Sequence, residues 1–353
     1  MSTVIIGGGP AGAAATIALA RSGARPLLLE RDAVVAEKVC GEFLAADAAQ
    51  RLGALGLDLA ALGAVPIRRA IFASGPSQAE MRLPFAAWGL PRATLDAALL
   101  DTARAAGAEV SVGMPVRDAS WNGHSWRVRL AGGQAIDAPA LVLATGKHEL
   151  RGLRRAAVGG AIGVKLPLLG NVPEAAILLL ACVGGYAGLQ PRPGGGANLC
   201  AALDPRAPGV AEAARSGPAF MAHVARGSAL AERVLAGLVQ AVARPLTIAG
   251  VPYGHVALGC EAFRVGDQAS VIPSFCGDGV AMALASGEAA AMAVLGKTTP
   301  HTYQAEWARR IRGGMRLAGL VSMLTSRAPR LLVAGVALAP AVAGWTAQRT
   351  RLG

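Results

Sequence analysis

Few sequence patterns leave a chain as little structural freedom as the one at its start. An apolar run, TVII, leads directly into GGGPAG, which places a G-x-G-x-x-G motif at Gly7, Gly9 and Gly12, and an alanine-rich helix is predicted over 13–20. The first glycine allows a tight turn, the second lets a pyrophosphate approach the backbone, and the third lets helix and strand pack closely. Free N–H groups at the helix start then face the anion. The pattern predicts a dinucleotide-binding site.

An acidic residue supports that prediction. A second predicted strand, 26–29, ends in Glu30, which lies about twenty residues beyond the glycine motif, where an acid binds a ribose hydroxyl. An acid at this position disfavours a 2′-phosphate, so the site suits FAD or NAD better than NADP. A lone glycine motif can also be a plain tight turn, but here a strand precedes it and a helix follows it.

Composition excludes several classes of protein. The chain has 353 residues, of which 53% are hydrophobic, so it can form one large or two interleaved globular domains. The first predicted strand begins at Thr3 and leaves no room for a leader, so we expect a cytoplasmic protein. Its five cysteines show no C-x-x-C pair or metal-binding spacing, so neither disulfides nor zinc are expected. The net charge of +12 is dispersed and rarely interleaved with aromatic residues, which argues against nucleic acid.

The C-terminal tail, 299–353, has a different character. From Lys297 onward the chain carries nine Lys or Arg residues and a single acid, Glu306, between apolar runs at 317–324 and 331–345. The longer run is interrupted by a proline and is too short to span a bilayer. Two interpretations stay open at this point: the tail is a helical cap packed on the body, or it is an amphipathic element that rests on an anionic membrane.

The middle of the chain alternates short strands and helices. A hairpin is predicted over 67–83, and Asn-Gly and Gly-Gly turns join an antiparallel meander that interrupts the parallel nucleotide-binding sheet. The expected strands and helices of this region are a helix at 95–106, strands at 110–112, 116–121, 126–130, 140–144, 177–183 and 197–203, and helices at 211–226 and 230–242.

A third nucleotide-site element follows further along. Asp267 is predicted at a strand end, where its carboxylate can accept hydrogen bonds from a ribityl chain. Glycines at 277 and 279 then precede a small-residue helix, 280–294, whose positive N-terminal end would stabilise the anion of a reduced flavin.

In combination these motifs resemble the FAD-dependent geranylgeranyl reductase family, within the superfamily that includes p-hydroxybenzoate hydroxylase. The resemblance covers about the first 295 residues and rests on the glycine motif with Glu30, the KVCGE loop at 38–42, Arg92 with Asp96, and the segment 266–287. It implies an α/β fold in which a glutathione-reductase-like, FAD-binding Rossmann domain is interleaved with an antiparallel-sheet substrate domain and followed by C-terminal helices. The corresponding boundaries are 1–66, 90–150 and 255–298 for the FAD domain, 67–89 and 151–254 for the substrate domain, and 299–353 for the tail.

The resemblance also implies roles for single residues. The adenine half, pyrophosphate and ribityl chain of noncovalent FAD would contact Gly7, Gly9, Gly12, Glu30, Arg31, Arg92 and Asp267, and the flavin ring would lie by Gly277, Asp278 and Gly279. The segment 185–191 would face the ring from the substrate side.

The chain departs from its relatives in two places. Gly188 and Gln190 replace bulkier aromatic residues that are frequent in the family, and Thr145 replaces the acid of an Asp-Gly pair that hydroxylases use for FAD and NAD(P)H. A second G-x-G-x-x-G motif is absent, so the electron donor, NAD(P)H or another reductant, stays open.

Three residues are catalytic candidates, each with a structural alternative. Cys40 is predicted to be a wall of the flavin site or a proton donor, although free cysteine is commonly just buried. Glu42 is a catalytic acid or a solvated loop residue. Tyr186 orients or protonates a substrate, or bonds to backbone. Asp278 could instead cap its helix. Cys276 is a weaker candidate, and its pairing with Cys40 would require their side chains to converge.

The expected function is that of an FAD-dependent oxidoreductase that reduces carbon–carbon double bonds of a lipophilic, isoprenoid-like substrate. Hydride would come from reduced flavin and a proton from a nearby acid or water. The alternative is an FAD-dependent monooxygenase that hydroxylates a lipophilic phenol or polyketide, and a third reading is a flavin-binding partner without turnover. A halogenase is disfavoured because W-x-W-x-I-P is absent. The protein is expected in the cytoplasm or at the inner face of the membrane, and its oligomeric state is left open.

Overall fold

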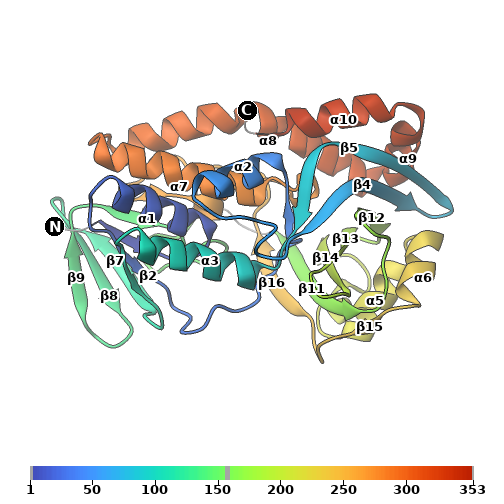
Figure 1. Ribbon diagram of the computed structural model, residues 1–353, viewed down its shortest axis with the longest axis horizontal. Helices are drawn as coiled ribbons and strands as arrows, with labels where there is room; N and C mark the ends of the chain where they lie inside the picture. Colours follow the sequence, from blue (N-terminus) through green and yellow to red (C-terminus); the bar gives the residue numbers. More distant parts are fainter. Residues whose placement is uncertain (1–2, 156–159, 352–353) are drawn as a thin grey trace.

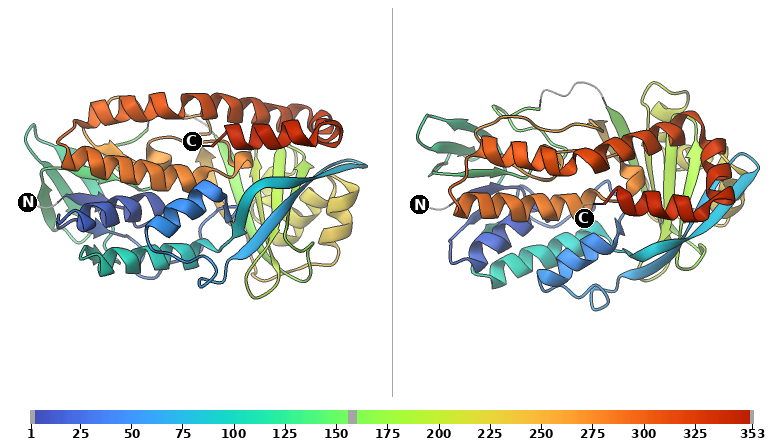
Figure 2. Two further views of the ribbon diagram at one scale, coloured as in Figure 1. Left: turned by 45° about the horizontal axis from the view of Figure 1, so that its top comes forward. Right: turned by 90° about the horizontal axis from the view of Figure 1, so that it is seen from above.

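The computed structural model describes residues 3–155 and 160–351. They form an elongated molecule in which two sheets lie side by side and three C-terminal helices run along one side of both (Figures 1 and 2). This arrangement confirms the predicted α/β class, with parallel and antiparallel sheets followed by C-terminal helices.

The first sheet is parallel and has five strands in the order β17-β10-β1-β2-β6. Its central strands are buried on both faces, so they consist of short, wholly apolar runs. Helix α1 packs against α3 and α7, where a side chain at Gly287 would meet the Ala11 carbonyl oxygen at 2.2 Å. The bounds are β1 Val4–Ile6, β2 Leu27–Leu29, β6 Glu109–Ser111, β10 Leu141–Leu143, β17 Phe263–Arg264, α1 Pro10–Arg21, α3 Arg92–Ala105 and α7 Gly279–Leu295.

The second sheet is mainly antiparallel, in the order β15-β11-β14-β13-β12-β4-β5-β3, with β16 also paired to β11. One face is covered by α4, α5 and α6, and the core there is formed by leucines, alanines and Phe220. The bounds are β3 Phe43–Leu44, β4 Val65–Ser74, β5 Ser77–Gly89, β11 Ala161–Leu169, β12 Ala176–Cys182, β13 Gly185–Pro191, β14 Ala197–Leu203, β15 Val239–Gln240, β16 Leu246–Val251, α4 Val210–Ala213, α5 Gly217–Ala225 and α6 Ala229–Leu235.

A small third sheet, β7-β8-β9, contains two of the strands predicted for the meander, 116–121 and 126–130, whereas the predicted strands 110–112 and 140–144 belong to the parallel sheet. It packs against the outer side of β1 and β10 around Trp126, which is 2% exposed. The remaining elements of the body are β7 Val116–Trp121, β8 Trp126–Leu130, β9 Ala135–Ala138, α2 Ala46–Ala54 and the 3₁₀ turns η1 Gly266–Gln268 and η2 Ser274–Cys276.

The tail folds into α8 (Pro300–Arg327), α9 (Pro329–Leu338) and α10 (Pro340–Arg349). Each helix has proline in its first turn, where the missing N–H costs nothing. Val333 and Val336 of α9 pack on β4 and β5, so the tail is a cap on the body. Among the described residues no single helix is both long and apolar enough to cross a bilayer. The pair α8 and α9 meets both criteria together but is bent by 113°.

The structure differs from the sequence-based prediction in several elements. Strands β9 and β13 were not predicted, because two short alternating runs lie between glycines that read as turns. The helix expected over 230–242 ends at Leu235, since the chain then joins the second sheet as β15. Strand β3, inside the segment assigned to the FAD domain, pairs with β5 of the second sheet.

Candidate functional site

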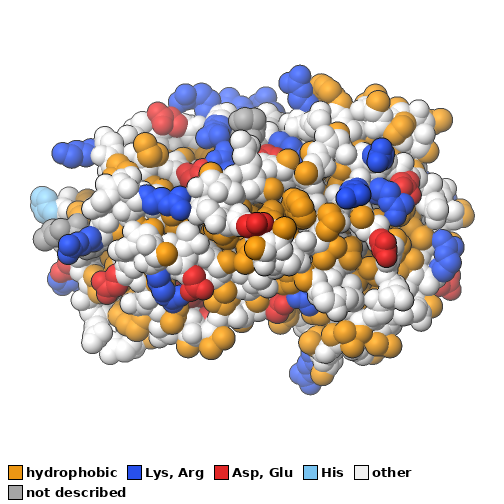
Figure 3. Space-filling model, viewed as in Figure 1, with side chains coloured by type: hydrophobic (Ala, Val, Ile, Leu, Met, Phe, Trp, Pro, Cys, Tyr) orange, Lys and Arg blue, Asp and Glu red, His pale blue; other side chains and the backbone are white. Residues whose placement is uncertain are grey.

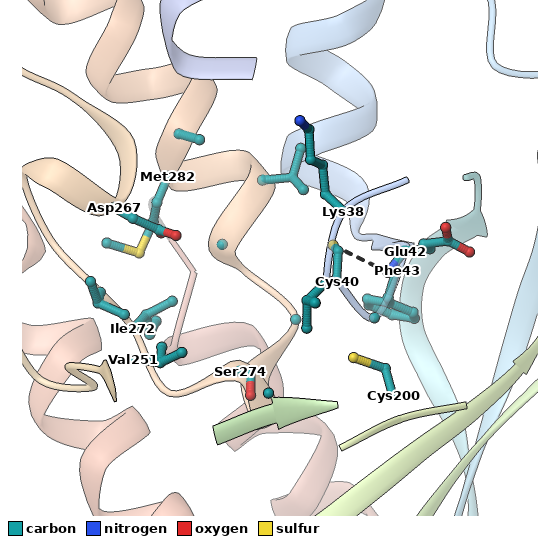
Figure 4. A pocket seen from close by; sticks show the side chains of 18 of the residues that line it. Lys38, Cys40, Glu42, Phe43, Cys200, Val251, Asp267, Ile272, Ser274 and Met282 are labelled. Atoms are coloured by element: carbon teal, nitrogen blue, oxygen red, sulfur yellow. Dashed lines mark hydrogen bonds between the residues drawn. The ribbon is translucent and has the colours of Figure 1, made fainter. Parts of the chain in front are cut away.

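A cavity of about 1030 Å³ extends from the glycine-rich turn, across the exposed face of the second sheet, to the C-terminal helices. Its polar half is lined by the carboxyl ends of β1, β2 and β10 and by the loop before β3. Its other half is apolar. In Figure 4 Cys40 and Phe43 lie on one side of this space, Asp267 and Met282 on the other, and Ser274 and Cys200 in the lower part of the view.

The glycine-rich turn has two kinds of glycine. A Cβ at Gly7 or Gly12 would meet a backbone oxygen at 2.4 Å or 1.9 Å, so the fold itself requires these two glycines. A Cβ at Gly9 would meet nothing closer than Arg92 Nη2 at 3.6 Å, and Gly9 lines the cavity. Gly9 is the N-cap of α1 and no side chain caps this helix, so its first N–H groups are left for a ligand. The turn therefore fits a pyrophosphate.

Glu30 lies at the end of β2, at the edge of the same cavity. Its Oε2 accepts a hydrogen bond from Gly8 N–H at 2.6 Å and its Oε1 accepts one from Asp32 N–H at 3.0 Å. A carboxylate has about four acceptor positions, so this fixed group still has capacity for ribose hydroxyls. Arg31 also lines the cavity, and its guanidinium contacts His148 at 3.1 Å.

Two further charged groups face the polar half. Arg92 forms a two-pronged pair with Asp96, with N···O distances of 2.9 and 2.8 Å, which fixes the guanidinium beside Gly9. Asp267 lies in η1, just beyond the end of β17, with Lys147 Nζ at 2.9 Å. Burial alone would raise the pKa of Asp267, but Lys147 holds it below its ordinary value, so the carboxylate is ionised at neutral pH.

The loop 37–42, which carries Cys40, is held in place by side chains of the second sheet. Asn198 of β14 donates to the backbone oxygens of Cys40 and Gly41 at 3.0 Å each. Lys165 of β11, which is fully buried, donates to Glu37, Glu42 and the Lys38 carbonyl.

Those contacts correct one expectation about this loop. Glu42 is 1% exposed and has a positive φ of 64°, so it is not a solvated loop acid. Burial opposes the charge of Lys165, but Glu42 and Glu37 raise its pKa, and Arg192 balances the second carboxylate. Burial raises the pKa of Glu42, while Lys165 and Arg192 oppose that shift, so the cluster is a buried and paired structural anchor.

Cys40, Cys200 and Cys276 line the cavity. The Cys40 Sγ accepts a hydrogen bond from Glu42 N–H at 3.3 Å. Burial raises the pKa of Cys200 and of Cys276 to about 12, which keeps both as thiols at neutral pH. All five cysteines are free. Low thiolate content disfavours the redox role considered for Cys276.

A trio of hydroxyl groups lies in the wall of the cavity. Ser274 Oγ accepts a hydrogen bond from Tyr253 Oη at 2.9 Å and lies 2.7 Å from Tyr186 Oη. Tyr186 therefore bonds to a side chain and not to backbone. Burial raises the pKa of both tyrosines above its ordinary value, so both stay protonated at neutral pH.

The start of α7 differs from the expectation at one residue. Gly277 and Gly279 line the cavity, and Gly277 has a φ of 75°. Asp278 does not belong to the cavity wall. Its buried carboxylate points to Arg351 at 3.2 Å and makes no capping hydrogen bond. Asp278 is the N-cap residue of α7, as the alternative prediction had it, but its side chain pairs with Arg351 of the tail instead of capping the helix.

The apolar half of the cavity lies between the β4–β5 hairpin, β12 and the C-terminal helices. Gly188 also lines it, and a Cβ there would find no atom closer than 3.8 Å. Gly188 thus leaves room where relatives were expected to carry aromatic side chains, whereas Gln190 is buried outside the cavity. The apolar wall consists of Ala70, Phe72, Met81, Leu83, Phe85, Ile177, Leu179, Val321, Leu324, Leu331, Leu332, Val336, Ala339, Val342 and Ala343.

Several polar residues of this site were missed by sequence analysis: Lys147, Lys165, Asn198, Tyr253 and Ser274. Each lies in a strand or loop without a recognisable motif, and each finds its partner far along the chain. Lys165, amid the apolar residues of β11, was the one usable signal, because an unpaired buried lysine is not tolerated. In residues 3–155 and 160–351 no cluster of three or more His, Cys, Asp or Glu side chains could hold a metal ion.

Comparisons with known proteins agree with this geometry. Residues 1–148 match the family described as FAD binding domain, so the chain contains an FAD-binding domain. This match covers the part of the chain that contains the glycine-rich turn, Glu30 and Arg92, all of which line the cavity. No curated protein matches the chain by sequence.

Three solved structures illustrate the shared fold. The flavin-dependent brominase Bmp2 has a TM-score of 0.81 and 18% identity over 99% of this chain and 92% of its own. A geranylgeranyl bacteriochlorophyll reductase-like protein from Thermoplasma acidophilum has a TM-score of 0.74 and 18% identity over 95% and 91%. The myxobacterial chondrochloren halogenase CndH has a TM-score of 0.76 and 21% identity over 92% and 82%. Identities this low establish a common fold and not a common reaction.

Proposed function

We propose that this protein reduces a carbon–carbon double bond in a lipophilic, isoprenoid-like substrate. One observation carries the proposal: the cavity continues from the glycine-rich turn into an apolar chamber, one wall of which is formed by the tail helices. A chamber with such walls favours a long hydrocarbon over a charged or sugar-like molecule, because hydrocarbon is the group that gains most from leaving water.

The residues present fit FAD. Gly9 leaves room for the pyrophosphate, Glu30 is fixed where ribose binds, and Asp267 is held ionised by Lys147 near the end of β17. When bound and reduced, FAD supplies the hydride equivalent for saturating a double bond. We propose NAD(P)H or another reductant as the electron donor.

The chain's own residues would bind the substrate, exclude water and supply the second hydrogen as a proton. Tyr186, Ser274 and Tyr253 have three hydroxyl protons but share only two hydrogen bonds. One hydroxyl proton is therefore not used within the trio, whichever atom donates in the Tyr186–Ser274 contact. With both phenol pKa values raised, the trio acts as a donor and not as a base. We propose that Tyr186 presents that proton to the substrate, with Cys40 as part of the flavin-facing wall.

The test uses mass spectrometry of polyprenyl lipids incubated with prereduced enzyme, without oxygen and in air with bromide. A gain of two hydrogens under anaerobic conditions supports the reductase. Incorporation of oxygen or bromine only in air would overturn it in favour of the chemistry of a monooxygenase or a brominase such as Bmp2.

Tyr186→Phe and Tyr253→Phe test the proton source in the same assay. We expect Tyr186→Phe to slow turnover by about 10²-fold or more while FAD binding is unchanged. Equal turnover in both variants and wild type would remove the trio from the mechanism.

A further inference from the structure

We propose that the outer surface of α8, α9 and α10 docks on an anionic membrane and that the cavity opens within this surface. The proposal that this surface docks on a membrane rests only on the properties of the surface itself. The entry of substrate through the opening rests on the proposed function, since it requires a lipophilic substrate.

The tail helices have apolar residues on two faces. Val333 and Val336 point inward onto Phe72 and Met81, as a helix that covers a sheet should. On the outside, Leu331 is 69% exposed and Leu338 is 86% exposed, seven residues apart on α9 and therefore on one face. A helix that covers a core needs one apolar stripe, and the second stripe has no partner among residues 3–155 and 160–351.

The neighbouring helices extend this surface. On α10, Val342 is 62% exposed and Trp345 is 55% exposed, three residues apart. On α8, exposed apolar side chains recur at helical spacing: Leu320, Met323 and Leu324. Figure 3 shows hydrophobic and basic side chains side by side over α10, at the upper right of the molecule. The outer surface is thus an extended apolar area and not a few scattered residues.

The charged side chains on this surface indicate which kind of partner it would bind. No Asp or Glu occurs between positions 307 and 351. Arg349 lies over the Trp345 ring at 5.1 Å, a pair suited to the headgroup region of a bilayer. A surface with apolar and cationic but no anionic side chains is complementary to an anionic lipid surface, whereas a second copy of the same surface would bring like charges together. The exposed arginines of the tail are Arg309, Arg310, Arg312, Arg316, Arg327, Arg330 and Arg349.

The cavity reaches the outside at the same place. Leu324, Leu331 and Val342 line the cavity and are also exposed, so they form the rim of its opening. Leu331 follows the bend of 113° between α8 and α9, and Arg327 and Arg330, close to it in sequence, are both exposed. A hydrocarbon chain that enters here meets apolar side chains as far as Tyr186.

Cosedimentation with vesicles tests the docking surface. We expect the wild type to bind phosphatidylglycerol–phosphatidylcholine vesicles, to bind pure phosphatidylcholine weakly, and to be released by high salt. The triple variant Leu331→Glu/Leu338→Glu/Trp345→Glu should lose about tenfold in partitioning for each side chain. Leu258→Glu and Val239→Glu are matched controls, because both residues are exposed and lie outside the tail. Thermal melting of every variant should match the wild type.

Three results would overturn the docking proposal. The wild type would fail to bind anionic vesicles, the triple variant would bind them as well as the controls do, or the wild type would be a dimer in solution that the triple variant dissociates. The assay involves no turnover. If the protein binds vesicles but reduces no lipid, the proposed function fails and the docking surface stands.

A second variant tests the opening. Gly335 lines the cavity on α9, and a Cβ there has no neighbour within 4 Å, so we expect the side chain of Gly335→Trp to fill the opening and the thermal melting of this variant to match the wild type. The probe is the fluorescent polyene parinaric acid. We expect its affinity to fall about tenfold or more while vesicle binding is unchanged. Equal probe affinity in variant and wild type would contradict entry at this rim.

Discussion

Substitution of Gly9 by alanine separates what the fold needs from what the cofactor needs. Gly9 has an ordinary extended backbone, with φ −72° and ψ −178°, and a Cβ would have no neighbour closer than 3.6 Å. The folded apoprotein should therefore keep its stability to within about 0.5 kcal/mol. The added methyl group would occupy the space through which a pyrophosphate reaches the N–H groups of α1.

The expected loss of affinity follows from the contacts at stake. Displacing the pyrophosphate weakens one or two hydrogen bonds to a charged group, at about 1.5–3 kcal/mol each. One lost bond corresponds to roughly a 10- to 150-fold rise in the FAD dissociation constant. Quenching of flavin fluorescence during titration of the apoprotein measures this constant, and urea unfolding measures stability.

Two other glycines serve as controls. Gly53→Ala lies on the exposed face of α2, where a Cβ meets nothing within 4 Å, and should change neither quantity appreciably. Gly12→Ala should destabilise the apoprotein itself, because its Cβ would lie 1.9 Å from the Gly7 carbonyl oxygen. If Gly9→Ala binds FAD as tightly as the wild type, the pyrophosphate does not lie at this turn and the assignment of the cradle is wrong.

Two further predictions concern buried charge. Lys165→Met should lower the free energy of unfolding by about 3–5 kcal/mol, because Glu42 stays buried without its main partner. The double variant Lys165→Met/Glu42→Gln should recover part of this loss. Urea unfolding measures both variants, and no recovery in the double variant would contradict the pairing. Burial raises the pKa of Asp278 to about 6, above its unfolded value, so its contribution to stability is complete below about pH 4 and is lost as pH rises through about 6. The two pKa values differ by about two units, or about 3 kcal/mol, so Asp278→Asn should flatten the stability curve between about pH 4 and pH 6, and an unchanged slope would mean that Asp278 is not the titrating group.

The parts of the site that follow from local sequence were predictable. Gly7 and Gly12 sit in a motif whose spacing alone dictates a strand, a turn and a helix, and Glu30 follows at a fixed offset. The hairpin at β4–β5 and the meander β7–β9 were likewise marked by turn residues between apolar runs. In each case the interacting residues are close in sequence or repeat with a fixed period.

The rest depends on tertiary contacts that no local pattern encodes. Lys165 and Glu42 meet across 123 positions of the chain, and Ser274 joins Tyr186 across 88 positions. The orientation of Asp278 is decided by Arg351, in a tail whose packing the sequence left undecided between a cap and a membrane element. In the structure the tail packs on the body as a cap. Membrane contact through the outer surface of the tail is our proposal.

The anchoring of the Cys40 loop determines which segments must be transferred together in a chimaera of two related proteins. In sequence the loop leaves β2 of the FAD domain, yet Lys165 and Asn198 hold it to the second sheet, and it continues into β3 on that sheet's edge. A chimaera cut at the sequence boundary near position 66 would graft this loop onto a sheet that lacks its two anchors. The cut that preserves the site transfers residues 37–44 together with β11 and β14, so the wall facing the cofactor is inherited with the substrate domain.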